Sequence, residues 1–308
     1  FSQQSIPEGT RDDTLFRAAV NLSNKGVPED LVKQTMIGMN AQCSPPLDVE
    51  QLKKINKSAN SYRAQAILAL TDLGNGERFA KDHMNDVIYC SDQETWYAWN
   101  GKYWEKNDVI IMQKAKKTTR DMLVEAAYFP EMNDSLRKWQ KSSESIQRQV
   151  AMITAAKTQP SISKRTDDLN KSTEHFNVQN GTLDLKKAIF KEHERSDYFT
   201  KIAKANYHPQ SDCPRWKQFI SEICCQREDL EEYLKILCGY LLIGERNEQV
   251  IVYLLGDGAN GKSIFLETLS HIFGDYSGVI SAKAFIAREA GSIPNDVAGL
   301  LGKRLVTL

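Results

Sequence analysis

The chain has 308 residues, and its 40 basic and 40 acidic side chains leave no formal net charge. This length exceeds that of one typical domain, and the composition, 41% hydrophobic and 26% charged, is that of a folded protein. A balanced charge neither indicates nor excludes a nucleic-acid partner, because a basic patch can be offset elsewhere. With no run of about 18 apolar residues and no targeting signal, we expect a cytoplasmic protein without a membrane span. Because the first residue is Phe1, we expect the chain to begin inside a longer protein.

The six cysteines are scattered and form no C-x-x-C motif. The candidate zinc ligands that lie close together in the sequence are His208, Cys213 and the adjacent pair Cys224-Cys225. Zinc sites usually combine paired ligands at short spacing, and free thiols in a reducing compartment are the better interpretation here. We therefore predict no metal site among them.

The first 65 residues predict a small helical module. Apolar residues at helical spacing indicate a helix over 14–23. Pro28 begins a second helix, with two acidic residues in its first turn. Asp48 is the predicted N-cap of a third helix that ends near Asn60.

Two Asn-Gly dipeptides predict β-hairpins in the next part of the chain. The first, Asn100-Gly101, lies between aromatic-rich runs over 95–104, and a two-residue loop there pairs Trp99 with Lys102 and Tyr97 with Trp104. The second, Asn180-Gly181, lies within 176–185. Its predicted apolar face holds Phe176, Val178, Leu183 and Leu185, and its polar face holds Asn177, Gln179, Thr182 and Asp184.

Two features of this region suit nucleic acid but have simpler explanations. The aromatic residues of the first hairpin could stack on bases, yet packing in a small sheet is the better interpretation. The helical sequence between the hairpins, from about Asp108 to Ala156, is rich in Lys and Arg and could follow phosphates. Acidic residues interrupt it, so a solvated helix face is favoured over DNA contact.

A phosphate-binding motif follows the next two predicted helices, over 214–225 and 227–242. Residues 256–263 match G-x-x-x-x-G-K-[ST], between a predicted buried strand at Val250 to Leu255 and an apolar helix. The predicted nucleotide-binding residues are Gly256, Asp257, Gly258, Ala259, Asn260, Gly261, Lys262 and Ser263. Glycines let backbone N–H groups turn toward phosphate oxygens at a helix N-terminus. We expect ATP and Mg²⁺ as cofactors, with Lys262 as the catalytic residue on the β and γ phosphates and Ser263 as a metal ligand.

The motif, with Asn260 just before its second glycine, resembles that of superfamily 3 helicases of the phage, plasmid and poxvirus primase-helicase type. Other segments resemble this family in the family's own order: 9–16 and 45–47, 73–79, 96–104, 176–185, 213–216 and 237–242. Lys186-Lys187-Ala188 departs from it, since the family usually turns there at a glycine. A second departure is that the Walker B acids, the sensor strand and the arginine finger have no counterpart after the predicted strand at 303–308.

The resemblance implies an ATP-dependent helicase that forms a ring, a hexamer in the family, and acts on single-stranded or forked DNA, often fused to a primase-polymerase. We therefore expect a multidomain α+β protein with the start of a C-terminal α/β P-loop (AAA+-like) core. The predicted domains are a helical module resembling the primase C-terminal domain (1–65), an α+β helicase N-terminal domain (66–207), a helical collar (208–245) and a truncated P-loop core (246–308). Without the missing acids, the chain alone is expected not to hydrolyse ATP appreciably.

Two other functions stay open at this point. One is a non-catalytic DNA-binding or ring-forming scaffold of a replication protein, which would bind DNA without ATPase activity. The other is a P-loop phosphotransferase acting on a small molecule, although no lid or acceptor site is visible upstream.

Overall fold

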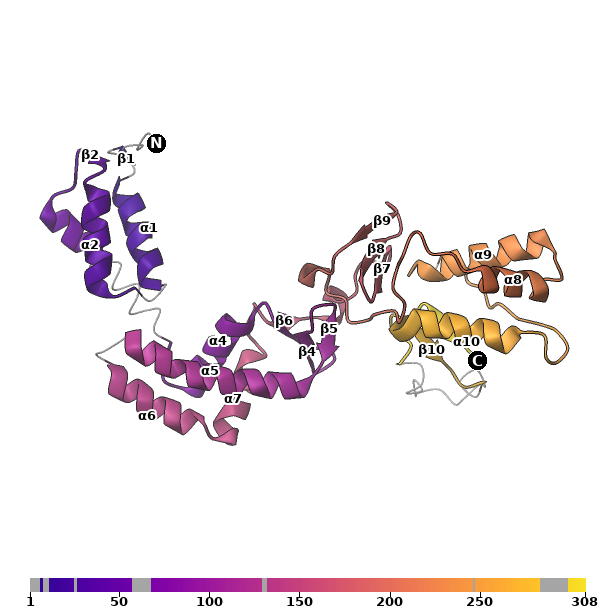
Figure 1. Ribbon diagram of the computed structural model, residues 1–308. Coiled ribbons are helices and arrows are strands. Elements are labelled where there is room, and N and C mark those ends of the chain that lie inside the picture. The colour runs from indigo at the N-terminus through magenta and orange to yellow at the C-terminus, as the bar shows by residue number, and fades with distance from the viewer. Residues whose placement is uncertain are drawn as a thin grey trace. The chain divides into compact units, whose positions relative to one another are not determined.

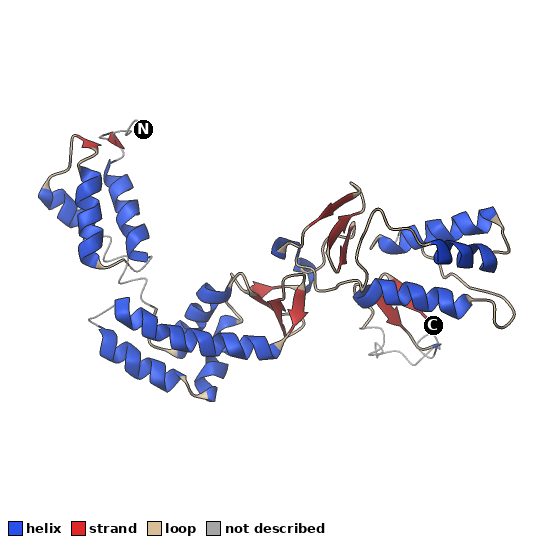
Figure 2. Ribbon diagram, in the orientation of Figure 1, coloured by secondary structure: helices blue, strands red, loops and turns tan. Residues whose placement is uncertain are grey.

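The computed structural model describes residues 6–7, 11–24, 27–56, 68–128, 132–245, 247–282 and 299–308. It combines helices with four small sheets, as Figures 1 and 2 show. The chain divides into two compact units, Phe1–Met84 with Val109–Ile162 and Asn85–Asp108 with Ser163–Leu308. The four predicted domain ranges and the P-loop core stay predictions.

The N-terminal module is helical, as predicted. It contains α1 (Arg11–Asn24), α2 (Glu29–Asn40) and a helix over 49–56, with a short parallel pair between β1 (Ile6–Pro7) and β2 (Cys43–Ser44). Its core consists of Leu15, Ala19, Val32, Met36, Cys43 and Leu47. Asp48 caps the third helix as predicted, because its carboxylate accepts from the backbone N–H of Gln51 at 2.8 Å. The predicted end of that helix near Asn60 lies outside the described residues.

Four helices lie together in the first unit: α4 (Asp72–His83), α5 (Asp108–Tyr128), α6 (Asn133–Ser143) and α7 (Ile146–Ala156) (Figure 1). Thr71 caps α4, since its hydroxyl accepts from the backbone N–H of Gly74 at 3.1 Å. Gly76 lets α4 approach α7 closely: a Cβ there would lie 2.6 Å from the Cβ of Ala155.

The first predicted hairpin exists, but its predicted register is wrong. β4 (Thr95–Trp99) pairs with β5 (Trp104–Lys106) so that Trp99 faces Trp104 and Tyr97 faces Lys106. The loop has four residues, 100–103, rather than two. The Asn100 side chain accepts from the backbone N–H groups of Lys102 and Tyr103, both at 3.0 Å, which stabilises the wider turn. β3 (Val87–Cys90) and β6 (Ser163–Lys164) complete this sheet in the order β5-β4-β3-β6.

The second predicted hairpin is formed by β7 (His175–Val178) and β8 (Gly181–Asp184), with β9 (Ile189–Lys191) added beyond β8. Phe176 faces Leu183, and the predicted apolar and polar faces are confirmed. Val178 pairs with Gly181, so the loop is Gln179-Asn180 rather than Asn180-Gly181. Gly181 is therefore the first residue of β8. Only glycine fits at this position, because a Cβ there would be 2.5 Å from the carbonyl oxygen of Lys191.

The C-terminal part contains α8 (Pro214–Ile223), α9 (Glu228–Leu242) and α10 (Lys262–Phe273), and the parallel strands β10 (Ser277–Val279) and β11 (Leu305–Thr307). β11 lies where a strand was predicted over 303–308. The strand predicted at 250–255 is not formed, and Leu255 is 89% exposed. An apolar run becomes a strand only where a neighbouring strand exchanges backbone hydrogen bonds with it. β10 and β11 pair with each other, and no described strand pairs with residues 250–255.

Candidate nucleotide-binding loop

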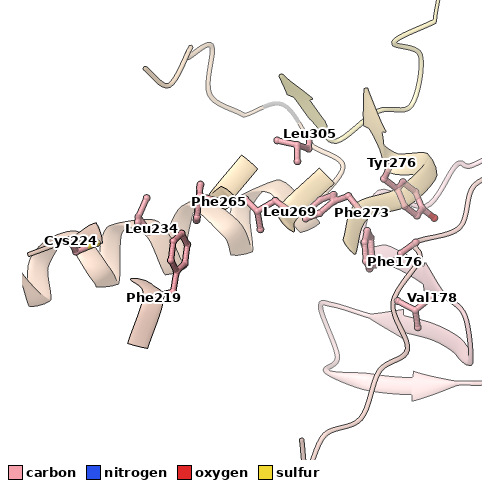
Figure 3. Packing of buried hydrophobic residues seen from close by; sticks show 11 residues of the cluster. Phe176, Val178, Phe219, Cys224, Leu234, Phe265, Leu269, Phe273, Tyr276 and Leu305 are labelled. Atoms are coloured by element: carbon pink, nitrogen blue, oxygen red, sulfur yellow. The ribbon is translucent and has the colours of Figure 1, made fainter. Parts of the chain in front are cut away.

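The predicted phosphate-binding loop leads into α10, which is anchored by its apolar face. Phe265, Leu269 and Phe273 are buried at spacings of four residues along this helix. Figure 3 shows them between Phe219 and Leu234 of the preceding helices and Phe176 of the hairpin. The stacked rings of Trp216 and Phe265, 5.9 Å apart, hold the first turn of α10 against α8. The start of α10 is therefore held in place by helix packing.

The backbone of the loop adopts conformations that few residues tolerate. Gly261 is the N-cap of α10 with φ +85°, and its carbonyl accepts the first helical bond from the N–H of Phe265 at 3.0 Å. A Cβ on Gly261 would lie 2.6 Å from Cγ2 of Ile223, so a side chain would clash with α8. Ala259 also lies in the left-handed region, with φ +58°. The motif residues thus form a tight turn that ends directly at a helix N-terminus.

Lys262 is the first residue of α10, and its side chain folds back onto the loop. Its Nζ donates to the carbonyl oxygens of Gly256 at 2.9 Å and Asp257 at 3.1 Å, and to Oδ1 of Asn260 at 2.5 Å. The ammonium group is therefore held at the centre of the motif by uncharged acceptors. No carboxylate of the described residues pairs with it in an ion bridge.

This donor set fits a phosphate ligand. The N-terminal amides of α10 and the Lys262 ammonium supply positive charge at one place, and Gly256, Gly258 and Gly261 keep side chains away from it. Ser263 is exposed in the first turn, where its hydroxyl is open to a ligand. The described residues show no group of three or more acidic, His or Cys side chains that could hold a metal ion by themselves. Ser263 is thus the residue of the motif that could contribute to an Mg²⁺ site.

Several expectations around the loop are not met or cannot be judged. The buried strand expected before the loop is absent, as described above. Residues 283–298, between β10 and the turn before β11, lie outside the described residues.

Two protein families match the chain. Residues 3–65 match primase C terminal 1 (PriCT-1), and residues 76–225 match the family described as D5 N terminal like. Both domains are of the kind found in phage- or plasmid-type primase-helicase proteins, and neither match covers a helicase motor. Comparison with curated proteins gives no match. Neither matched range contains residues 256–263, so the nucleotide site rests on the motif and its geometry.

The segment 73–79, which carries part of the sequence resemblance, has a structural role. Asn75 is fully buried: it donates to the hydroxyl of Ser143 at 3.1 Å and accepts from the indole of Trp139 at 2.9 Å. Arg78 is buried too, and it forms a bidentate pair with Glu125 at 2.7 and 2.8 Å. These residues join α4 to α5 and α6.

The candidate nucleic-acid residues divide between core and surface. Trp96 and Trp104 are buried, which confirms the packing interpretation for these two aromatic residues of the first hairpin. Lys116, Lys117 and Arg120 are exposed on α5, and Lys117 pairs with Asp121 along the helix. This arrangement fits the solvated helix face favoured from the sequence, and DNA contact there stays the less favoured alternative.

Sequence reasoning missed Arg304, which joins three segments of the second unit. Its guanidinium donates to the carbonyls of Leu242, at the end of α9, and of His175, in β7. It also lies over the ring of Tyr276, 4.7 Å from the centroid. Burial lowers the pKa of this arginine, and Tyr276 opposes that shift. No local pattern could have identified it, because all of its partners are distant in sequence.

A cavity of about 320 Å³ lies in the second unit but contains no motif residue. It is lined by Lys164, Asp168, Lys171, Ser172, Ser196, Asp197 and Tyr198. Lys171 pairs with Asp168 at 3.0 Å, and Asp197 pairs with Lys191 at 2.9 Å, so much of its charge is neutralised internally. It is not the nucleotide site. No helix in the described ranges is long and apolar enough to cross a membrane.

Proposed function

We propose that this chain is a segment of an ATP-dependent DNA helicase, and that residues 256–263 bind ATP with Mg²⁺. The observation that carries the proposal is the motif and its geometry. Gly261 is the N-cap of α10 in the left-handed conformation, and the Lys262 ammonium donates to carbonyl oxygens of the loop. The two family matches support the replication setting.

Each motif residue has a distinct part in this proposal. The loop amides and the N-terminus of α10 would bind phosphate oxygens, because both present N–H groups to an anion. Lys262 would exchange its carbonyl acceptors for the β and γ phosphates. Ser263 would give one hydroxyl ligand to Mg²⁺, and the bound ion would neutralise charge on the phosphates. The further acids that hydrolysis requires are not assigned to any described residue.

The test is ATP-Mg²⁺ binding measured by titration calorimetry on the full chain. Replacing Lys262 with Ala removes the ammonium group that donates to the loop carbonyls of Gly256 and Asp257, and we expect at least tenfold weaker binding, about 1.4 kcal/mol. Lys235→Ala is the matched control, because Lys235 lies exposed on α9 and pairs only with Glu232 at 3.4 Å. Equal affinity of Lys262→Ala and the unchanged chain would exclude this loop as the nucleotide site.

We further propose that the intact protein acts on single-stranded DNA as a closed ring of identical subunits, with a hexamer as the expected size. The support is the family resemblance, in which α8 and α9 correspond to a helical collar. Light scattering of the intact protein with nucleotide and single-stranded DNA measures the mass directly. A monomer mass at micromolar concentration contradicts ring formation.

A further inference from the structure

Three backbone segments meet at the end of α10 that is opposite the nucleotide-binding loop. They are the segment 199–204, the turn η4 (Gly274–Tyr276) and the turn over 299–304. Asp275 joins the first two, since its N–H donates to the carbonyl of Ile202 at 3.0 Å and its carboxylate accepts from the N–H of Ile202 at 3.2 Å. Lys303 joins the third, because its Nζ donates to the carbonyl of Asp275 at 2.8 Å.

Two glycines allow these segments to approach. Gly274 has φ +54°, and a Cβ there would lie 2.8 Å from the backbone nitrogen of Lys204. Gly302 has φ +71°, and its Cβ would lie 2.8 Å from Cε of Lys201. The twelve residues of α10 place this meeting point about 18 Å along the helix from the loop. It is therefore separate from the nucleotide site.

Lys201 is the unusual residue at this point. Its side chain is partly buried with its hydrocarbon portion against Gly302, yet its ammonium group has no hydrogen-bond or ion-pair acceptor in the described residues. Burial lowers the pKa of Lys201, the nearby Lys303 lowers it further, and Asp275 raises it. Burial and repulsion by a second cation both disfavour the charged form of Lys201, and an anion bound there would favour it.

An aromatic side chain lies close by. Tyr103 is half-buried in the loop of the first hairpin, which is tied to segment 199–204 by a backbone bond from Trp104 to Phe199 at 2.8 Å. The Asn177 amide donates to the carbonyl of Lys102 at 3.3 Å and to the carbonyl of Lys201 at 3.1 Å, so the hairpin loop lies beside Lys201. Burial raises the pKa of the Tyr103 phenol, and the carboxylates of Glu105 and Asp275 raise it further. An aromatic ring beside lysines is a common arrangement for binding unpaired nucleotides, because the ring stacks on a base while the lysines bind phosphate.

We propose that Lys201 and Lys303 form a second anion site, which binds a backbone phosphate of single-stranded nucleic acid, with Tyr103 beside it. Lysine suits this ligand, since its ammonium acts as a point charge on phosphate oxygens. Asp275 carries one negative charge against the two lysines, so the group keeps a net positive charge, and one of its carboxylate oxygens accepts from the N–H of Ile202. The choice of nucleic acid over free phosphate rests on the proposed helicase function, but the site does not depend on ATP binding.

The experiment is fluorescence anisotropy of a labelled oligothymidine of about 20 nucleotides, with the full chain and without ATP or Mg²⁺. Lys201→Met keeps the hydrocarbon contact with Gly302 and removes the positive charge of Lys201. Lys303→Gln removes the positive charge of Lys303. We expect the double variant to bind at least fivefold more weakly. The magnitude of the slope of log K against log salt should fall by about 0.7 for each lost phosphate contact. Lys201→Arg should retain binding.

The controls separate this site from general charge and from the nucleotide loop. Lys217→Gln and Lys235→Gln remove exposed lysines of the same unit, and each should change affinity less than twofold. Lys262→Ala should bind the oligonucleotide with unchanged affinity. The result for the lysine site can therefore be interpreted even if the ATP proposal fails. Thermal melting checks that the double variant is folded. The proposal is overturned if this variant binds the oligonucleotide with the same affinity as the unchanged chain, or if the control variants lose as much affinity as it does. Displacement of the oligonucleotide by equimolar inorganic phosphate would overturn the nucleic-acid assignment.

Discussion

Arg78 shows how the first unit is held together at the scale of single residues. The residue is 5% exposed, and its guanidinium uses all three nitrogens, bonding to Glu125 and to the carbonyls of Leu68 and Ala69 at 2.7 and 2.9 Å. The charge is therefore buried but fully paired. Such a pair adds little net stability, yet removal of one partner leaves an uncompensated charge.

Replacing Arg78 with Met should lower the free energy of unfolding by about 3–5 kcal/mol, because Glu125 and two carbonyls lose their partner. Urea denaturation followed by circular dichroism measures the effect. Arg120→Met is the control, since Arg120 is exposed on α5, and we expect a change within about 0.5 kcal/mol. A loss below 1 kcal/mol in Arg78→Met would show that water replaces the arginine.

Tyr276 gives the second unit a dependence on alkaline pH. The residue is 2% exposed, its hydroxyl accepts from the N–H of Asn177 and donates to the carbonyl of Lys201, both at 3.3 Å, and burial raises its pKa to about 12. In the unfolded chain the pKa is about 10. The folded state therefore favours the neutral phenol, so its contribution is complete below pH 10 and is lost as the pH rises to 12.

We expect this residue to account for a loss of about 2–3 kcal/mol between pH 9 and pH 12. The measurement is the unfolding free energy of the unchanged chain and of Tyr276→Phe across this range. The variant should be less stable at pH 8, where it lacks two hydrogen bonds, but should lose less stability on alkalinisation. Parallel curves for the two proteins would contradict the assignment, because all other tyrosines are common to both.

At the scale of elements, the space around each helical glycine shows how closely its helix packs against a neighbour. α4 approaches α7 at Gly76, where the backbone of Ala155 and Ala156 leaves no room for a side chain. In α9, by contrast, Gly239 has no atom within 4 Å of the position of a Cβ. The two helical glycines therefore differ in what a methyl group would meet.

This contrast predicts opposite outcomes for the same substitution. Gly76→Ala should destabilise the chain by about 1–3 kcal/mol through overpacking, despite the better helix propensity of alanine. Gly239→Ala should stabilise it by up to about 1 kcal/mol, since only propensity changes. Thermal melting of both variants decides this, and stabilisation by both would mean that α4 can move away from α7 without loss.

At the scale of the whole molecule, the chain consists of separately packed parts. The core of the N-terminal module is made from residues between Ile6 and Ile55. The second unit has a different core, which runs from the second hairpin through α8, α9 and α10 to β11 (Figure 3). Each core is closed within its own part, so the parts need not fold together.

We predict that residues 3–65, the range of the primase match, fold on their own. The isolated fragment should show a helical circular dichroism spectrum and a cooperative melt, although a domain of this size is marginally stable. Leu15→Ala should remove about 2–5 kcal/mol, enough to unfold it, because Leu15 is fully buried. Lys53→Ala, at an exposed position, should leave the melt unchanged. A fragment without cooperative melting would mean that the module needs the rest of the chain.

The sequence by itself determined the elements whose signals are local. Helix spacing, the cap at Asp48, the two hairpins and their faces, and the phosphate-binding motif all follow from neighbouring residues. Tertiary structure decided what depends on distant partners. The register of the first hairpin is not among these, because the Asn100 side chain set the wider turn through bonds to Lys102 and Tyr103, two and three residues away. The apolar run at 250–255 formed no strand, because no described strand pairs with it. Lys201 and Arg304 became notable only where segments far apart in the sequence met, since burial and charge pairing depend on the assembled fold.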